Sequence, residues 1–116
     1  MNHLVEIRSL TLKPGTREEF HRLYLEQTLP LLLHWHIDVV AHGPSLHDED
    51  SYYVIRRFDS LAHREKIEDD FYNRVYWREG PREAAIAMIE DYMDVVLEID
   101  EVAVERLRKG RNIFRE

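Results

Sequence analysis

At 116 residues the chain has the length of a single domain, and the absence of cysteine excludes disulfides, thiolate nucleophiles and sulfur-ligated metals. Its 23 acidic and 16 basic residues give a formal charge of -7, which would repel a nucleic-acid backbone or an anionic membrane surface. The apolar run 29–33 is too short to span a bilayer, and the N-terminus lacks the apolar block of a signal peptide. We therefore expect a cytoplasmic protein with neither nucleic-acid nor membrane partners.

The first part of the chain predicts a strand followed by a helix. Residues 3–12 alternate between apolar and polar side chains, as in a strand, and a Lys-Pro-Gly break follows. Thr16 and Glu19 have the spacing of a capping box, which indicates a helix start near Arg17. Pro30 removes a helical donor, so we expect a kink there and one last short turn.

The middle of the chain predicts two strands and a second helix. Residues 37–42 form a strand that ends at a Gly-Pro pair, and residues 51–59, SYYVIRRFD, form the next strand. Ser60 is placed to cap the following helix. We expect that helix to bury a stripe spaced by four residues: His63, Ile67 and Phe71.

The last third predicts a helix, a strand and a short charged segment. Residues 73–80 are irregular or weakly helical, and Pro81 then opens a third helix that we expect to continue to Tyr92. Residues 94–99 have the alternation of a strand. Residues 100–109 begin with acids and end with bases, the order that a helix dipole favours.

The resulting order is strand, helix, strand, strand, helix, strand, which predicts an α+β, ferredoxin-like split βαβ fold with a four-stranded antiparallel sheet. We expect one domain over residues 1–116, with a core over 3–99 and a C-terminal helix or tail over 100–116. Helices on one side of such a sheet leave the other face bare, and that face carries apolar residues from several strands. A second copy covering it would make the protein a homodimer.

Three segments carry a family resemblance: VEIRSLTLKPGTREEFHRLY, YYVIRRFDSLAHREKIEDDFYN and YWREGPREAAIAMIEDY. Together they resemble a bacterial member of the NIPSNAP family. The resemblance implies a dimeric α/β-barrel, in which the sheets of two chains pack face to face. In such a dimer Glu6 and Arg8 would meet charges of the partner. Cofactor-independent antibiotic-biosynthesis monooxygenases and muconolactone isomerases share this architecture, so the fold does not decide the activity.

In barrel relatives of this kind, small ligands lie in a cleft between the sheet and its own helices. Phe58 precedes the turn into a helix, so strand parity places Arg56 in that cleft and Arg57 on the opposite face. A cleft arginine beside aromatic rings would hold an aromatic or carboxylate-bearing ligand. The alternative is a structural Arg56 paired with an acidic residue such as Glu6, Asp38 or Glu98. The predicted ligand-binding residues are Trp35, His36, Tyr52, Arg56, His63, Tyr72 and Trp77.

The remaining chemical candidates are few. His34 and His36 are a possible metal pair, but no third ligand accompanies them, which favours hinge or surface histidines. His63 is either a general base or a partly buried histidine at the helix interface. The acidic run 68–70 is interpreted as the solvated face of its helix. The sequence contains no phosphate loop, dinucleotide fingerprint or nucleophile elbow, so we expect no cofactor and no metal.

Three hypotheses for the function follow. The first is a homodimeric barrel of unassigned activity that binds a small apolar or aromatic molecule. The second is an enzyme similar to the cofactor-independent monooxygenases or isomerases, in which a histidine or tyrosine moves a proton while Arg56 holds an anionic oxygen. The third is a structural or protein-interaction dimer without catalysis.

Overall fold

The computed structural model describes the backbone of residues 2–113 and the side chains of residues 2–109. Its centre is one antiparallel sheet with the strand order β2-β3-β1-β4. The strands are β1 (Asn2–Leu12), β2 (Asp38–Pro44), β3 (Ser51–Phe58) and β4 (Ile89–Asp100). This topology confirms the predicted ferredoxin-like arrangement.

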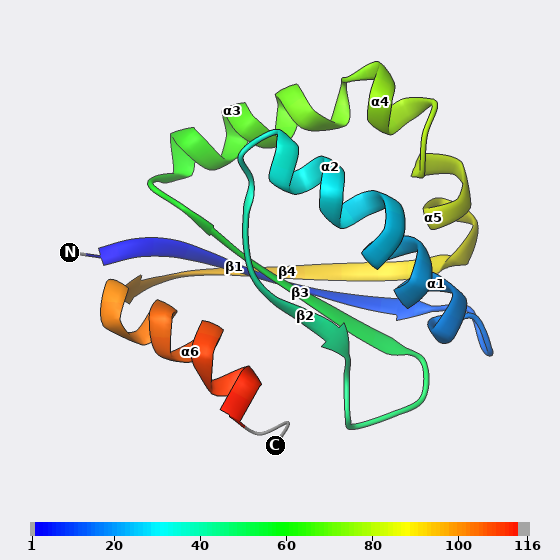
Figure 1. Ribbon diagram of the computed structural model, residues 1–116, viewed down its shortest axis with the longest axis horizontal. Helices are drawn as coiled ribbons and strands as arrows, with labels where there is room; N and C mark the ends of the chain where they lie inside the picture. Colours follow the sequence, from blue (N-terminus) through cyan, green and yellow to red (C-terminus); the bar gives the residue numbers. More distant parts are fainter. Residues whose placement is uncertain (1, 114–116) are drawn as a thin grey trace.

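The helices divide between the two sides of the sheet (Figure 1). They are α1 (Arg17–Leu23), the π-helical turn η1 (Tyr24–Thr28), α2 (Leu29–His34), α3 (Leu61–Tyr72), α4 (Val75–Arg78), α5 (Arg82–Met88) and α6 (Glu101–Ile113). The helices from α1 to α5 lie over one face, and α6 lies against the other. The layer of five helices is therefore where a cleft against the sheet can form.

The segment from α1 to α2 is one helical rod with a change of pitch. Pro30 lies in the first turn of α2, where a missing N–H is tolerated, and η1 occupies the residues before it. This confirms the predicted interruption. The predicted capping box is wrong, however. The Thr16 hydroxyl donates to the carbonyl of Lys13 at 2.7 Å instead of accepting from a backbone N–H of the helix.

The third predicted helix ends earlier than expected. α5 stops at Met88, and Ile89 already has the extended backbone angles φ -92° and ψ 123°. Ile89 pairs with Leu12 at the end of β1, so the pairing with β1 continues to this residue. Residues 89–92 therefore belong to β4, and the prediction that the helix reaches Tyr92 is wrong. The Ser60 cap is confirmed, since its hydroxyl accepts from the N–H of His63 at 3.0 Å.

Each face of the sheet has its own hydrophobic core. Under α1 to α5, the buried side chains are Leu10, Leu12, Phe20, Tyr24, Leu32, Ile37, Tyr52, Val54, Phe71, Ala85 and Met88. On the opposite face, Val104 of α6 is fully buried against a smaller cluster of Val5, Val40, Ala41 and Ile55. The prediction that this face is bare is therefore wrong at one end, where α6 covers it.

The rest of the second face is exposed and apolar. Along β4, Met93 is 70% and Val95 is 53% exposed, and Leu97 is 37% exposed. Large apolar side chains on neighbouring positions of a sheet are unusual at a free surface. Among residues 2–113, no helix combines the length and the apolar character needed to cross a membrane.

Candidate functional site

A buried ion pair stands at the centre of the helix-covered face. Glu6 of β1 is directly opposite Arg56 of β3 in the sheet register, so their side chains share one face. Both are almost completely buried, at 0% and 2% exposure. Arg56 Nε donates to Glu6 Oε1 at 2.9 Å, and its Nη2 donates to the same oxygen. Burial of both charges is tolerated because each is paired.

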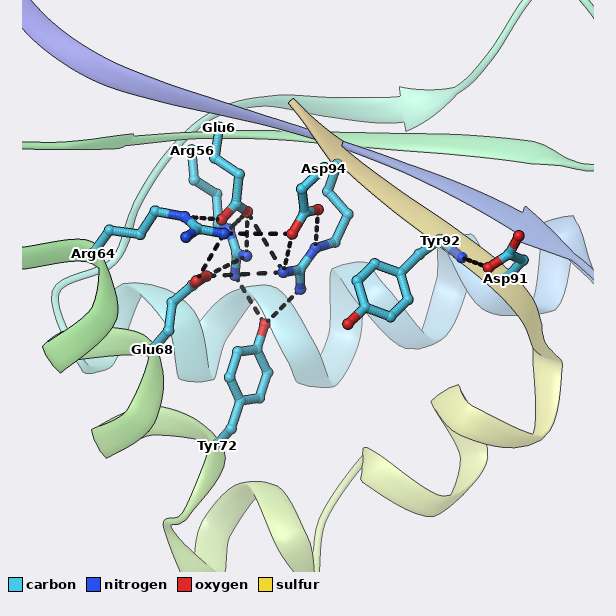
Figure 2. Close-up of polar contacts among 9 residues, drawn as sticks. Glu6, Arg56, Arg64, Glu68, Tyr72, Asp91, Tyr92 and Asp94 are labelled. Carbon is cyan, nitrogen blue, oxygen red and sulfur yellow. Dashed lines mark hydrogen bonds and ion pairs between the residues drawn. The ribbon is translucent and has the colours of Figure 1, made fainter. Parts of the chain in front are cut away.

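Two further arginines extend this pair into a charged network (Figure 2). Arg64 Nε donates to Glu6 Oε2 at 2.6 Å. Arg8 binds Asp94 with both ends of its guanidinium, at 2.8 Å from Nε and 3.0 Å from Nη2. Arg8 and Asp94 are cross-strand neighbours in the pairing of β1 with β4. The network therefore links three strands to α3.

Helix α3 contributes three side chains spaced by four residues: Arg64, Glu68 and Tyr72. Glu68 Oε2 accepts from Arg56 Nη2 at 3.0 Å, so it faces the sheet. The interpretation of residues 68–70 as a solvated run is therefore wrong for Glu68. The Tyr72 hydroxyl accepts from Arg56 at 2.9 Å and from Arg8 at 3.2 Å (Figure 2).

The two glutamates have pKa values shifted in opposite directions. Burial raises the pKa of Glu6, but the charges of Arg56 and Arg8 outweigh burial and hold it at about 2. Burial raises the pKa of Glu68 to about 7, and the nearby Glu6 charge adds to this rise while Arg56 opposes it. Near neutral pH, protonation of Glu68 leaves three guanidinium groups facing two carboxylates.

The network corrects one expectation about the interface. Glu6 and Arg8 were expected to meet a partner across the barrel, but both lie under the helices of their own chain. The reason is strand parity, because residues 6, 8 and 10 of β1 share the face that packs on the helices. Arg57 takes the opposite face, as predicted, where it contacts His3 at 2.9 Å and Asp59 at 3.4 Å.

Next to the network lies a cavity of about 110 Å³ between the sheet and the helices, called here the inner cavity. Its lining is Arg8, Leu10, Phe20, Tyr24, Thr28, Leu32, Val54, Arg56, Tyr72, Trp77, Ala85 and Ile89. The Tyr24 hydroxyl is buried and has no hydrogen-bond partner within the described part of the chain. Burial also raises the pKa of Tyr24 above its ordinary value, which keeps the hydroxyl protonated as a donor.

A second cavity of about 310 Å³, the outer groove, lies between the C-terminal end of α2 and α3. Its lining is Trp35, His36, His63, Lys66, Ile67, Asp70, Phe71 and Arg74. Three of the predicted ligand-binding residues, Trp35, His36 and His63, line this groove and not the inner cavity. The stripe formed by His63, Ile67 and Phe71 therefore borders the outer groove, while the Arg64 stripe of the same helix faces the sheet.

The single predicted cleft is thus two separate sites. Arg56, Tyr72 and Trp77 line the inner cavity. Tyr52 lines neither cavity. Its hydroxyl lies 2.6 Å from Nδ1 of His21, and its ring packs edge-on against Phe20. His63 is directed back to its own helix start, where its Nδ1 accepts from the N–H of Asp59 at 3.1 Å.

Among the side chains of residues 2–109, no three or more His, Asp or Glu are grouped so that they could hold a metal ion. His34 packs edge-on against Trp35, with ring centroids 5.1 Å apart, and His36 lines the outer groove. These two histidines therefore have different surroundings.

Sequence reasoning missed Arg8, Tyr24 and Glu68 as site residues. Spacing by four from Arg64 would have placed Glu68 and Tyr72 on one side of α3. The same parity that placed Arg56 also applies to Arg8 once the strand pairing is known. No local signal marks Tyr24, because its environment depends on how η1 packs on the sheet.

The solved structures that resemble this chain define its fold class. A NIPSNAP domain protein from Burkholderia xenovorans aligns with a TM-score of 0.74 at 19% identity, over 84% of this chain and 95% of the other. A NIPSNAP family protein from Agrobacterium tumefaciens aligns with a TM-score of 0.76 at 14% identity, over 82% of this chain and 90% of the other. The chain therefore has the fold of NIPSNAP-family structures, as the sequence resemblance implies.

An antibiotic biosynthesis monooxygenase-like protein from Caulobacter crescentus also shares this fold. It aligns with a TM-score of 0.60 at 14% identity, over 85% of this chain and 89% of the other. No protein-family model matches the sequence, and no curated protein matches it either. At these identities the similarity establishes the fold and leaves the activity to be argued from the site.

Proposed function

We propose that the protein binds a small, mostly apolar organic acid in the inner cavity. The observation that carries this proposal is the lining of the cavity, which combines Arg8 and Arg56 with aromatic rings and includes Tyr24, whose buried hydroxyl has no partner among the described residues. A buried donor without an acceptor costs free energy that a ligand oxygen would recover. A ligand carboxylate or carbonyl oxygen is the group that this donor requires.

The charges beside the cavity favour an anion. Arg8 and Arg56 both line it, and protonation of Glu68 near pH 7 gives the network a surplus positive charge. Binding of an anion should in turn favour the protonated form of Glu68, so affinity should rise as the pH falls through about 7. This dependence distinguishes an organic acid from a neutral apolar ligand.

The size of the cavity limits the ligand to about one ring. A cavity of roughly 150 Å³ lined by apolar side chains accommodates benzene. The inner cavity has about 110 Å³, so it can take at most one ring, and the carboxylate of a one-ring acid must lie at its edge. Trp77 and Phe20 provide aromatic walls against which a ring can pack. Benzoate is therefore a suitable first probe, and benzyl alcohol and benzylamine are its neutral and cationic counterparts.

The test is a titration of the protein with these three compounds by calorimetry. Benzoate should bind more tightly than benzyl alcohol, and benzylamine should not bind. Tyr24→Phe should weaken benzoate binding about fivefold, the effect of one lost hydrogen bond. Tyr76→Phe changes an exposed tyrosine and serves as the matched control. Equal binding of benzoate by the wild type and Tyr24→Phe would contradict the proposal.

We also propose that the functional form is a cytoplasmic homodimer. The exposed apolar face formed by Met93, Val95 and Leu97 supports the dimer. A two-fold pair would cover this face, which lies opposite the helices that enclose the inner cavity. Ligand binding and pairing would then use different sides of the sheet.

Light scattering coupled to size-exclusion chromatography tests the dimer. The wild type should have twice the mass of one chain, and Val95→Glu should shift it towards the monomer by placing a charge in the interface. Val102→Glu is the control, because Val102 is an exposed valine on α6, at 62% against 53% for Val95. A wild-type monomer at micromolar concentration would contradict the proposed assembly.

A second candidate function is proton transfer on the bound molecule without a cofactor. The observation that favours it is that Tyr72 lines the inner cavity and that its hydroxyl accepts hydrogen bonds from the guanidinium groups of Arg8 and Arg56. Such donors stabilise a developing phenolate or oxyanion. Glu68, with a pKa of about 7, contacts Arg56 in the same network and can exchange a proton near neutral pH.

Turnover distinguishes binding from catalysis. If Tyr72 moves a proton, Tyr72→Phe should lower kcat by at least about 100-fold for any substrate that is found. Its effect on KM should be small by comparison. If the protein only binds its ligand, solvent deuterium will not be incorporated into a bound acid such as phenylacetate during prolonged incubation.

A further inference from the structure

We propose that the outer groove is a second binding site, specific for an aromatic anion larger than the inner cavity can hold. The groove has about 310 Å³, which is within the range of small-molecule sites. Trp35, Ile67 and Phe71 form its apolar walls, and Lys66 and Arg74 supply positive charge. The combination fits a planar two-ring molecule that carries a carboxylate.

The two cations of the groove are exposed, unlike the buried and half-buried arginines of the charged network. Neither Lys66 nor Arg74 forms an ion pair or a side-chain hydrogen bond with any described residue. Asp70 is the only acidic residue in the lining. On a chain with a formal charge of -7, a local surplus of positive charge with no partner among the described residues favours an anionic ligand.

Arg74 is already placed for this role. Its guanidinium carbon lies 3.9 Å from the centre of the Trp35 ring, which fixes the group against the aromatic wall. A guanidinium that is stacked keeps its N–H donors in the plane and available to a carboxylate. Little side-chain entropy remains to be lost when the anion binds.

The backbone beside the groove is also unusual. His36 has a φ of 64°, a left-handed conformation that normally selects glycine. The turn ends α2 with two hydrogen bonds, from the His36 N–H to Leu33 at 3.1 Å and from the Ile37 N–H to Leu32 at 2.9 Å. The fold thus holds a histidine on the lining of the groove, although glycine would adopt this backbone conformation at a lower cost in free energy.

The two tryptophans of the chain allow the two sites to be observed separately. Trp35 lines the outer groove and Trp77 lines the inner cavity. Each indole N–H gives its own signal in a nitrogen–proton correlation spectrum, and Trp35→Phe and Trp77→Phe assign the two signals. One titration therefore shows separately whether a compound binds in the outer groove, from the Trp35 signal, and whether it binds in the inner cavity, from the Trp77 signal.

The experiment is a titration of the full chain with 2-naphthoate, followed at both indole signals, with 2-naphthalenemethanol as the neutral probe. Naphthoate should shift the Trp35 signal to saturation and leave the Trp77 signal in place. The combined variant Lys66→Gln and Arg74→Gln should weaken naphthoate at least about tenfold, with a small effect on the alcohol. Arg78→Gln, an exposed arginine outside the groove, should bind as the wild type does.

Two results would overturn the proposal. One is a Trp35 signal that does not move at millimolar naphthoate, whatever the Trp77 signal does. The other is binding of the neutral alcohol as tight as that of naphthoate, together with full affinity in the doubly substituted variant. Both substituted side chains are exposed, so these variants keep the fold in which the comparison is made.

Discussion

The inner cavity and the outer groove both combine arginine with aromatic rings, but their arginines differ in whether they are paired with carboxylates. Beside the inner cavity, each of Arg8, Arg56 and Arg64 binds a carboxylate of the network. In the outer groove, Arg74 stacks on Trp35 and binds no carboxylate among the described residues. The difference follows from burial, because a cation removed from water must be paired, whereas an exposed one need not be.

This comparison separates structural arginines from those that remain available to a ligand. The alternative considered for Arg56, a structural ion pair with Glu6, is present in the structure. Arg56 nevertheless also lines the inner cavity and contacts Tyr72, so pairing does not exclude a role in binding. The following changes test how far the two regions differ, beginning with the largest expected effect.

Replacing the buried arginine should destabilise the protein strongly. Arg56→Leu leaves Glu6 buried with a weakened set of partners, and we expect a loss of about 4 kcal/mol in the free energy of unfolding. Arg74→Gln in the outer groove should change it by less than about 0.5 kcal/mol. Urea denaturation measures both. Similar losses in the two variants would remove the distinction between the regions.

The protonation of Glu68 should make stability depend on pH. The unfolded chain loses this proton near pH 4.5, and the folded protein retains it to about pH 7. The folded state therefore binds more protons in this window, so the free energy of unfolding should fall as the pH rises through it, by on the order of 3 kcal/mol. The lowered pKa of Glu6 has the opposite effect, but only below pH 4.5: there the free energy of unfolding should fall as the pH falls, because Glu6 loses its stabilising charge.

Glu68→Gln isolates this contribution. Urea denaturation measures the free energy of unfolding at pH 5 and at pH 7.5. The decrease in this free energy from pH 5 to pH 7.5 should be smaller for the variant than for the wild type. Glu65→Gln, an exposed glutamate on the same helix, should retain the wild-type difference. An unchanged difference in Glu68→Gln would mean that another group controls this part of the pH dependence.

Removing the Tyr24 hydroxyl should stabilise the ligand-free protein. Tyr24→Phe deletes a buried donor that has no partner among the side chains and backbone that the structure describes, and we expect a gain of about 1 kcal/mol in the free energy of unfolding. The same change should weaken benzoate, so stability and affinity should move in opposite directions. A loss of stability on this substitution would show that the hydroxyl already has an acceptor.

The smallest effect is expected at the edge of the outer groove. His36→Gly removes the cost of a left-handed backbone at a side-chain-bearing residue, and thermal denaturation should show a gain of ~0.5–1 kcal/mol. His34→Gly, inside the last turn of α2, should be destabilising by a similar amount. If His36→Gly is also destabilising, the side chain contributes contacts that outweigh the backbone cost.

Much of the fold follows from local patterns in the sequence. Alternation and turn residues predicted the four strands in the right order, and Ser60 correctly marked the start of α3. Strand parity correctly directed Arg56 towards the helices and Arg57 away from them. These features depend on the periodicity of one strand or on the cap of one helix, which a few neighbouring residues determine.

The site was decided only by tertiary packing. A period of four on α3 fits both the His63 stripe and the Arg64 stripe, and only the rotation of the helix against the sheet selects which one meets Glu6. The same packing separates Trp35 from Trp77 and places Tyr24 against a cavity. Sequence periodicity specifies which residues share a face, but the contact between two faces depends on side chains from distant segments that fill the space together.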